Sequence, residues 1–403
     1  MEQTSELLNR LSESATLAMA RKTRELKALG HDIIGLSLGE PDFNTPDFIK
    51  DAAKQAIDDN FSHYTPVNGL LEVREAISKK FKRDNNLDYP ADQIVVSTGA
   101  KQSIANIVLS LINPGDEVLL PSPYWVSYSE IVKLAGGRPI LLNAPLADDF
   151  KITPRLLNVA MTDRTKLMIF SSPCNPTGSV YSKEELKNLA DVIVAYPGFL
   201  AISDEIYEYI NFVGDHHSLA SDSRIFDQVI TVNGVSKGFA MTGWRLGYIG
   251  APKWIADACT KIQGQITSGA SAISQKAAQA AIEADPSVVN YMKEAFHKRR
   301  DYVLSRLSKI TDLRVNEPEG AFYVFPDVSR LFGKIAPTGG IYNSNDLSMY
   351  LLNHAHVAVV AGDAFGDPLC IRISYAASME QLEKAMDRIE NAINILEPNP
   401  DRA

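Results

Sequence analysis

The sequence contains little cysteine, no excess of positive charge and no long apolar stretch. Only three of its 403 residues are cysteines, and no C-x-x-C pair occurs, so neither a disulfide framework nor a cysteine-based zinc site is expected. Lys and Arg number 40 against 49 Asp and Glu, a net charge of −9, which disfavours binding to phosphate backbones. No apolar stretch reaches the ~18 residues that cross a bilayer. We therefore expect a cytoplasmic protein without nucleic-acid or membrane partners.

Short β-branched runs and longer helical segments alternate over the first two thirds of the chain. This alternation predicts βαβ units and a largely parallel sheet covered by helices on both faces, an α/β fold. After about residue 290 the pattern changes to a long charged helix, several short strands and a terminal helix, which indicates a smaller α+β unit. At the other end, residues 5–30 are predicted to form one amphipathic helix.

Polar or ionisable side chains follow five consecutive strands of the predicted sheet. In open parallel sheets, ligands bind at the carboxyl ends of the strands. A purely structural sheet needs only turn residues there, which explains the Pro and Gly residues but not the others. The segments concerned are residues 97–101, 121–125, 172–178, 203–207 and 233–237.

Two of these segments have both a functional and a structural interpretation. Ser97–Lys101 lies at a strand-to-helix junction, where backbone N–H groups can bind an anion, although an ordinary helix cap has the same appearance. Asp204 and Tyr207 are three residues apart, hence on one face of a turn. They could bind a cationic group and a neighbouring oxygen, although an N-cap Asp beside a packed Tyr is the simpler interpretation when the pair is taken alone.

Lys237 is the most informative residue of the five segments. A lysine directly after a core strand is costly to bury unless its charge is used or lost. Burial favours the neutral, nucleophilic amine that Schiff-base chemistry requires. Arg245 follows eight residues later, and its guanidinium fork suits a phosphate group.

A serine hydrolase is the competing interpretation of the same segment. Gly234–Gly238 matches G-x-S-x-G around Ser236 and follows a strand, as that motif requires. Asp346 and His354 or His356 complete the chain order Ser, Asp, His. The pattern is short enough to arise by chance, and it leaves Lys237 unexplained.

No metal is expected. Glu294 and His297 have E-x-x-H spacing but occur as a single copy, without the second copy that a di-iron bundle needs. The pair His216–His217 falls in a polar loop, where we expect exposure to solvent.

Taken together, the motifs closely resemble the fold-type I pyridoxal-phosphate aminotransferases, and within them the prokaryotic-type aspartate aminotransferase branch. The resemblance covers nearly the whole chain. The motifs for the family are Asn175-Pro-Thr-Gly178, Asp204-x-x-Tyr207, Ser236-Lys237 with Arg245, and Arg372-Ile-Ser-Tyr375. Those for the branch are Gly39–Phe43, Tyr64–Pro66, Pro123–Tyr128 and Phe239–Arg245.

The resemblance implies a homodimer in which each chain has two domains. A large domain over residues 46–290 would contain a mostly parallel, seven-stranded-type sheet between helices. Residues 1–45 and 291–403 would together form the smaller α+β domain. The N-terminal helix and the small domain would move to close over bound substrate.

The resemblance also implies pyridoxal 5′-phosphate as cofactor and assigns residues to it. Lys237 would form the Schiff base and then transfer the proton, and Asp204 would pair with the ring nitrogen. Trp125 would stack on the ring. The 3-oxygen would be bound by Asn175 and Tyr207. The phosphate would be bound by Ser236, Arg245, the backbone amides of Gly99, Ala100 and Lys101, and Tyr64 of a second subunit.

The implied substrates are amino acids and 2-oxo acids. Arg372 would bind the α-carboxylate, assisted by Asn175 and the Gly39 backbone. Residues 263–272, where the animal-type enzymes are expected to place an arginine for the distal carboxylate, contain none. In the branch that this chain resembles, a lysine after the strand and a threonine near the N-terminus take that role, which implies Lys101 and Thr16.

The expected reaction is transfer of the amino group of L-aspartate to 2-oxoglutarate by a ping-pong mechanism. A prephenate or broader-range aminotransferase, acting on aromatic substrates or alanine, stays open. So do a β-lyase or decarboxylase with the same lysine and aspartate, and a non-catalytic regulator built on this fold.

Overall fold

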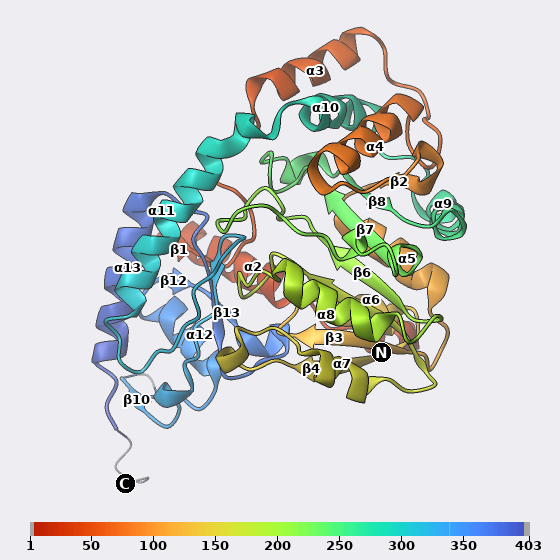
Figure 1. The fold of residues 1–403 in the computed structure, drawn as a ribbon. Helices are drawn as coiled ribbons and strands as arrows, with labels where there is room; N and C mark the ends of the chain where they lie inside the picture. Colours follow the sequence, from red (N-terminus) through yellow and green to blue (C-terminus); the bar gives the residue numbers. More distant parts are fainter. Residues whose placement is uncertain (1–3, 338, 399–403) are drawn as a thin grey trace.

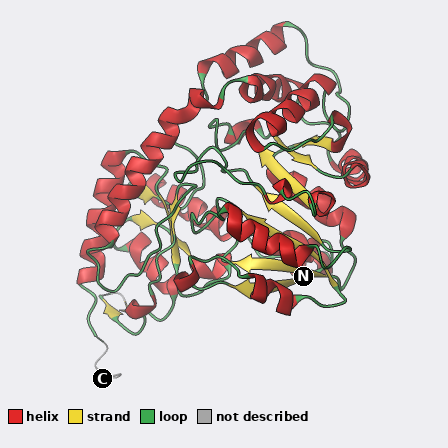
Figure 2. Cartoon of the chain, viewed as in Figure 1, coloured by secondary structure: helices red, strands yellow, loops and turns green. Residues whose placement is uncertain are grey.

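A seven-stranded sheet forms the centre of the molecule (Figures 1 and 2). The computed structural model describes residues 4–337 and 339–398. Strand β8 is antiparallel to both of its neighbours, and every other pair in the sheet is parallel. In spatial order the strands are β2 (Ile94–Ser97), β8 (Gly247–Gly250), β7 (Val229–Gly234), β6 (Leu200–Asp204), β5 (Thr165–Ser171), β3 (Glu117–Ser122) and β4 (Arg138–Asn143). The predicted mostly parallel α/β fold is confirmed.

Both faces of this sheet are buried, because alternate side chains of each strand enter different apolar clusters. Val95 and Val118 belong to one cluster, whereas their neighbours Val96 and Leu119 belong to the other. Helices α5, α6 and α9 cover the first face, and α4, α8 and α10 contribute to the second. The helices of this region are α3 (Asp47–Asp58), α4 (Leu71–Asn85), α5 (Ala100–Leu111), α6 (Ser127–Leu134), α7 (Pro154–Ala160), α8 (Lys183–Ile193), α9 (Lys253–Ile266) and α10 (Ala272–Glu283).

A second unit with short strands lies beside the large sheet and combines the C-terminal part of the chain with α2 and β1 from the N-terminal part (Figure 1). β1 (Ile34–Gly35) pairs in parallel with β12 (Val357–Ala358), so the N-terminal region joins the C-terminal one. β14 (Ile371–Ser374) lies between β13 (Val360–Ala361) and β9 (Tyr323–Val324), antiparallel to both. A hairpin joins β10 (Ile335–Ala336) to β11 (Gly339–Gly340), and the helices are α11 (Asn290–Leu307), α12 (Ser344–Asn353) and α13 (Met379–Asn394).

The single helix predicted over residues 5–30 is wrong. The structure has two helices, α1 (Glu6–Asn9) and α2 (Ala15–Ala28). Between them, the backbone N–H of Ser12 donates to the Glu130 carboxylate at 2.7 Å, and Ser14 adopts an extended conformation at the start of α2. A tertiary contact to α6 thus replaces the helical hydrogen bonding at this point.

Strands β4 and β8 and the helices α6, α7, α9 and α10 were missed by the sequence analysis. β8 has the sequence Gly-Tyr-Ile-Gly. Because glycine is unfavourable inside strands, this sequence does not predict the fully buried strand that the structure shows. β4 lies at the edge of the sheet, and its short apolar run Ile140–Leu142 directly follows Pro139, a residue that argues against a strand. None of the helices in the described part of the chain is long and apolar enough to cross a membrane.

Lys80 of α4 is a buried cation that lies away from the strand ends. Its Nζ forms an ion pair with Glu208 and donates to Asn85 Oδ1 at 2.8 Å, and Asn85 in turn donates to Glu208 at 3.0 Å. Both charged side chains are almost completely buried. Each charge therefore depends on the other for stabilisation that water cannot supply.

We expect Lys80→Met to lower the free energy of unfolding by about 3–5 kcal/mol, because it leaves the Glu208 carboxylate buried without its counter-charge. Denaturant unfolding measures this loss. The control is Lys253→Met, which breaks an exposed pair with Asp257 and should change little. If the two variants have equal stability, the buried pair does not carry the stabilisation assigned to it.

Candidate active site

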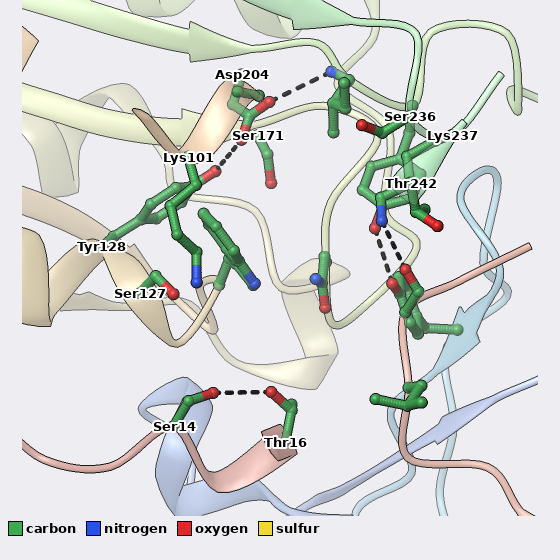
Figure 3. Close-up of a pocket in the computed structure, with 18 of the residues that line it drawn as sticks. Ser14, Thr16, Lys101, Ser127, Tyr128, Ser171, Asp204, Ser236, Lys237 and Thr242 are labelled. Atoms are coloured by element: carbon green, nitrogen blue, oxygen red, sulfur yellow. Dashed lines mark hydrogen bonds between the residues drawn. The ribbon is translucent and has the colours of Figure 1, made fainter. Parts of the chain in front are cut away.

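A cavity of about 320 Å³ lies at the carboxyl ends of the parallel strands (Figure 3). Strands β2, β3, β5, β6 and β7 run in one direction, so the residues that follow them meet at one edge of the sheet. The second unit contributes the opposite wall. The predicted site residues that line the cavity are Thr16, Gly39, Ala100, Lys101, Trp125, Asn175, Asp204, Tyr207, Ser236, Lys237, Arg245 and Arg372.

Lys237 lies in the turn after β7 and points its amine into the cavity (Figure 3). Its Nζ donates to the Gly39 carbonyl at 2.6 Å. The pKa of Lys237 is lowered to about 8, chiefly by burial; Glu40 opposes this shift, and the positive charges of Arg245 and Arg372 contribute to it. A substantial fraction of the amine is therefore neutral near physiological pH, as a nucleophilic amine requires.

Asp204 ends β6 and is buried. Its Oδ2 accepts a hydrogen bond from the Tyr128 hydroxyl at 2.7 Å, and its Oδ1 accepts from the Ile206 backbone N–H at 3.3 Å. Burial raises the pKa of Asp204 to about 6, and the Tyr128 hydrogen bond opposes that rise. At neutral pH the group is mainly a carboxylate, available to a cationic ring nitrogen.

Arg372 on β14 is 1% exposed and forms the wall contributed by the second unit. Its Nη1 donates to Asn175 Oδ1 at 2.8 Å, and its Nη2 donates to the Ser37 carbonyl at 2.6 Å. The guanidinium packs over the ring of Tyr323 at 4.5 Å. Its Nε–H has no acceptor among the described residues, so a buried donor faces an incomplete set of partners, which a carboxylate would complete.

Tyr207 and Tyr323 connect the two units at the cavity. Their hydroxyl groups are hydrogen-bonded at 2.7 Å, and both side chains are buried. Burial raises the pKa of each phenol, so both stay protonated at neutral pH. A Cβ at residue 39 would overlap the Tyr323 hydroxyl, which explains why only glycine fits beside it.

Gly99 and Arg245 form a cradle for an anion. Gly99 precedes the first residue of α5 and has φ of +86°, a conformation that favours glycine. A side chain there would overlap the Arg245 guanidinium. Arg245 is fixed by donation to the Thr242 carbonyl at 3.0 Å. The N-terminus of α5 and the Arg245 guanidinium therefore converge on one place, and residue 99 has no side chain to block it. Phosphate-binding sites have the same combination.

Lys101 lies on the side of the cavity away from Lys237 in the view of Figure 3, and Trp125 also lines the cavity. Lys101 Nζ is 5.0 Å from the Trp125 ring centroid. Burial, and to a lesser degree Arg245, lower the pKa of this lysine. Thr16 also lines the cavity, with its hydroxyl 2.9 Å from that of Ser14.

Comparisons with known proteins agree with this geometry. The family model described as "Aminotransferase class I and II" matches residues 31–389. The chain belongs to the class I and II aminotransferases. A Petunia hybrida protein named "Bifunctional aspartate aminotransferase and glutamate/aspartate-prephenate aminotransferase" is 48% identical over 97% of this chain and 83% of its own.

Two solved structures are similar throughout. The aspartate aminotransferase from Rhizobium meliloti has a TM-score of 0.95 and 38% identity over 98% of this chain and 100% of its own. The aspartate aminotransferase from Thermus thermophilus with maleate has a TM-score of 0.91 and 38% identity over 97% and 100%. The expected fold type I, the enzyme class and the cofactor, pyridoxal 5′-phosphate, are thereby confirmed for this aminotransferase.

Two predicted residues of the aminotransferase, Gly99 and Tyr64, do not line its cavity, although Gly99 packs against Arg245, which does. The Tyr64 side chain is 100% exposed and does not line the cavity of its own chain. Its predicted contribution from a second subunit stays a prediction.

Tyr128 and Tyr323 are contacts that the sequence analysis missed. Tyr128 lies within the Pro123–Tyr128 motif, and Tyr323 lies in a run predicted only as a strand. Neither residue follows a strand of the large sheet, so the strand-end criterion could not find them. Their positions near Trp125 and Gly320 are visible in the sequence, but the direction of their side chains is not.

The serine hydrolase alternative is wrong for this aminotransferase. Ser236 lines the cavity, but no histidine does so among the described residues. Asp346 lies in α12, His354 directly follows that helix, and the His356 ring lies 5.4 Å from that of His31 in a tilted arrangement. Neither histidine of the motif therefore lines the cavity with the serine.

His216 is not solvent-exposed as predicted. Its ring nitrogen lies 2.9 Å from Glu205, and its side chain is buried. Together with Glu208, these residues bring three potential metal ligands within 4.8 Å of one another. Lys80 pairs with Glu208, so the two carboxylates have cationic or imidazole partners from the protein itself.

The lowered pKa of Lys237 predicts the pH dependence of cofactor capture. Below pH 8 the amine is mostly protonated, so the rate at which the apoenzyme forms its Schiff base should rise roughly fivefold from pH 7 to pH 8 and level off above pH 9. Borohydride reduction followed by peptide mapping locates the trapped cofactor. Lys237→Ala should give no adduct at this position, and a rate that continues to rise to pH 10.5 would contradict the lowered pKa.

Proposed function

We propose that this enzyme transfers the amino group of L-aspartate to 2-oxoglutarate, by a ping-pong mechanism. One observation carries the proposal: besides the Lys237 amine and the Arg245 of the anion cradle, the cavity has two further cationic side chains, the buried Arg372 and the exposed Lys101. A dicarboxylic amino acid needs a cation for each carboxylate. The related proteins named above as aspartate aminotransferases support this choice of substrate.

Pyridoxal phosphate fits the chemical groups of the cavity. When bound, it supplies an aldehyde and an electron-withdrawing ring that stabilises negative charge at the amino acid Cα. We propose that Lys237 binds the aldehyde and later moves the proton. Asp204 would hold a proton on the ring nitrogen, and Trp125 would cover the ring. The 3-oxygen would be bound by Asn175 and Tyr207, and the phosphate by Ser236, Arg245, the amides of Gly99, Ala100 and Lys101, and Tyr64 of the second subunit.

Arg372 is proposed to bind the α-carboxylate through its fork of N–H groups. The unpaired Nε–H and the fixed Nη contacts to Asn175 and Ser37 support this role, because the guanidinium is already oriented before substrate arrives. The Gly39 carbonyl lies beside the Lys237 amine and would orient the substrate. Lys101 and Thr16 would bind the distal carboxylate. Closure of the N-terminal segment and small domain would exclude water.

Prephenate is the second candidate substrate. The Petunia hybrida protein is named for activity on both aspartate and prephenate. A lysine is a point charge rather than a rigid fork, so Lys101 would discriminate less strictly among distal carboxylates than an arginine.

The proposed assembly is a homodimer, each chain with a large domain of residues 46–290 and a small domain of residues 1–45 and 291–403. The pairing of β1 with β12 supports the assignment of the N-terminal region to the small domain. The full exposure of Tyr64, an aromatic side chain, supports a partner that covers it. All three cysteines are unpaired and buried, which agrees with the proposed cytoplasmic location.

We expect Arg372→Ala to lower kcat/KM by roughly 100-fold for every amino donor, because it removes the charged partner of the carboxylate that all amino acids share. A spectrophotometric panel of aspartate, glutamate, alanine and phenylalanine measures this loss. The products formed in the same panel distinguish transamination from β-elimination or decarboxylation. A lack of turnover would favour a non-catalytic regulator built on this fold. A loss confined to aspartate would contradict the assignment of Arg372.

Lys101→Ala should selectively impair dicarboxylic donors. We expect kcat/KM to fall by roughly 10- to 100-fold for aspartate, because one charge-assisted contact is lost, and to change little for alanine. Lys133→Ala is the matched control, since that nearby lysine is paired with Glu130 at 2.7 Å and lies outside the cavity. Equal losses with aspartate and alanine would refute the role of Lys101.

A further inference from the structure

Tyr128 is a buried phenol directed at the carboxylate proposed to face the cofactor ring nitrogen. It belongs to the first turn of α6 and is 1% exposed. Its hydroxyl donates to Asp204 Oδ2 at 2.7 Å, a charge-assisted hydrogen bond across two elements that are 76 residues apart in the chain. Figure 3 shows the two side chains meeting at the upper edge of the cavity.

The hydrogen bonds of Asp204 fix the orientation of its carboxylate. Tyr128 donates to Oδ2 and the Ile206 N–H donates to Oδ1, so rotation about the Cβ–Cγ bond would break both contacts. Each oxygen keeps a further lone pair for a ligand. The same phenol packs edge-on against Trp125, with ring centroids 5.5 Å apart. One residue therefore contacts both the carboxylate and the aromatic wall.

The charge on Asp204 depends on few compensating groups. Lys237 favours the ionised carboxylate, whereas the neighbouring charge of Glu205 and burial oppose it. The other groups at this end of the cavity, Ser171 and the protonated Tyr207, are neutral. Tyr128 is the side chain that donates directly to the carboxylate, so its removal would leave a buried charge with one backbone donor.

We propose that Tyr128 is a positioning residue that keeps Asp204 ionised and aimed at the cofactor ring nitrogen. This inference rests on the role proposed for Asp204. Tyr128 lines the cavity, and its proposed effect on the cofactor runs through Asp204 and Trp125. Through Asp204, it maintains the positive charge on the ring nitrogen, and through Trp125 it holds the surface against which the ring would lie.

The first test uses the apoenzyme, where catalysis plays no part. Because the pKa of Asp204 is raised when the protein is folded, the stability of the apoenzyme falls as pH rises toward 6. Tyr128→Phe raises that pKa further, so the fall should extend to higher pH. The difference in melting temperature between wild type and Tyr128→Phe, called the deficit, should increase from pH 5 to pH 8. The deficit should be independent of pH when both proteins also carry Asp204→Asn.

The control for this measurement is Tyr89→Phe, which removes an equally buried phenol from a neutral partner, the hydroxyl of Thr231 at 3.1 Å. Its deficit should be the same at each pH. If the deficit of Tyr128→Phe is also independent of pH, or varies with pH equally in the Asp204→Asn background, the coupling is absent and the proposal is overturned.

The second test uses the cofactor-loaded enzyme. In Tyr128→Phe, Asp204 is less ionised and the ring nitrogen of the cofactor is therefore less protonated. Such a ring withdraws less electron density, so the pH midpoint of the visible absorption change should rise. We expect kcat to fall by about tenfold with KM nearly unchanged, because the substrate carboxylates bind elsewhere. An unchanged midpoint together with wild-type kcat overturns the proposal. Full activity of Asp204→Asn alone would instead refute the role of Asp204, and the apoenzyme test would still measure the coupling.

Discussion

Burial of opposite charges in one cavity is the constraint on which the structure of this aminotransferase depends. Lys237, Asp204 and Arg372 would each be solvated in an unfolded chain, and each loses most of that solvation in the fold. Desolvation lowers the pKa of the lysine and raises that of the aspartate. The fold therefore holds these groups close to the protonation equilibria that proton transfer at neutral pH requires.

The protein offsets this cost mainly with fixed dipoles and hydrogen bonds rather than with direct ion pairs. The Lys237 amine donates to a backbone carbonyl, Asp204 accepts from a phenol and an amide N–H, and Arg372 donates to Asn175 and a carbonyl. Neutral partners stabilise a charge without cancelling it. Each group thus remains available to a ligand of opposite charge, which a tight internal salt bridge would have prevented.

Two structural units are needed to build the cavity because neither contains all of its charges. The strand ends of the large sheet contribute Lys237 and Asp204, whereas β14 contributes Arg372. Tyr207 and Tyr323 join the two units through a hydrogen bond directly at the site. Such an arrangement lets the α-carboxylate partner lie on a different element from the reacting amine, so that any relative movement of the units would change the substrate site and leave the cofactor groups in place.

The sequence by itself determined the α/β class, the five strand ends and about half of the residues that line the cavity. The alternation of strands with helices and the polar residues at strand ends depend only on local sequence pattern. Lys237, Asp204 and Asn175 follow strands whose short apolar runs are visible in the sequence. The tertiary structure decided what local pattern does not contain. It split the predicted N-terminal helix through the contact of Ser12 with Glu130, buried His216 beside Glu205, and turned Tyr128 toward Asp204. Those outcomes depend on contacts between residues far apart in the chain, whose geometry exists only after the sheet and helices have packed.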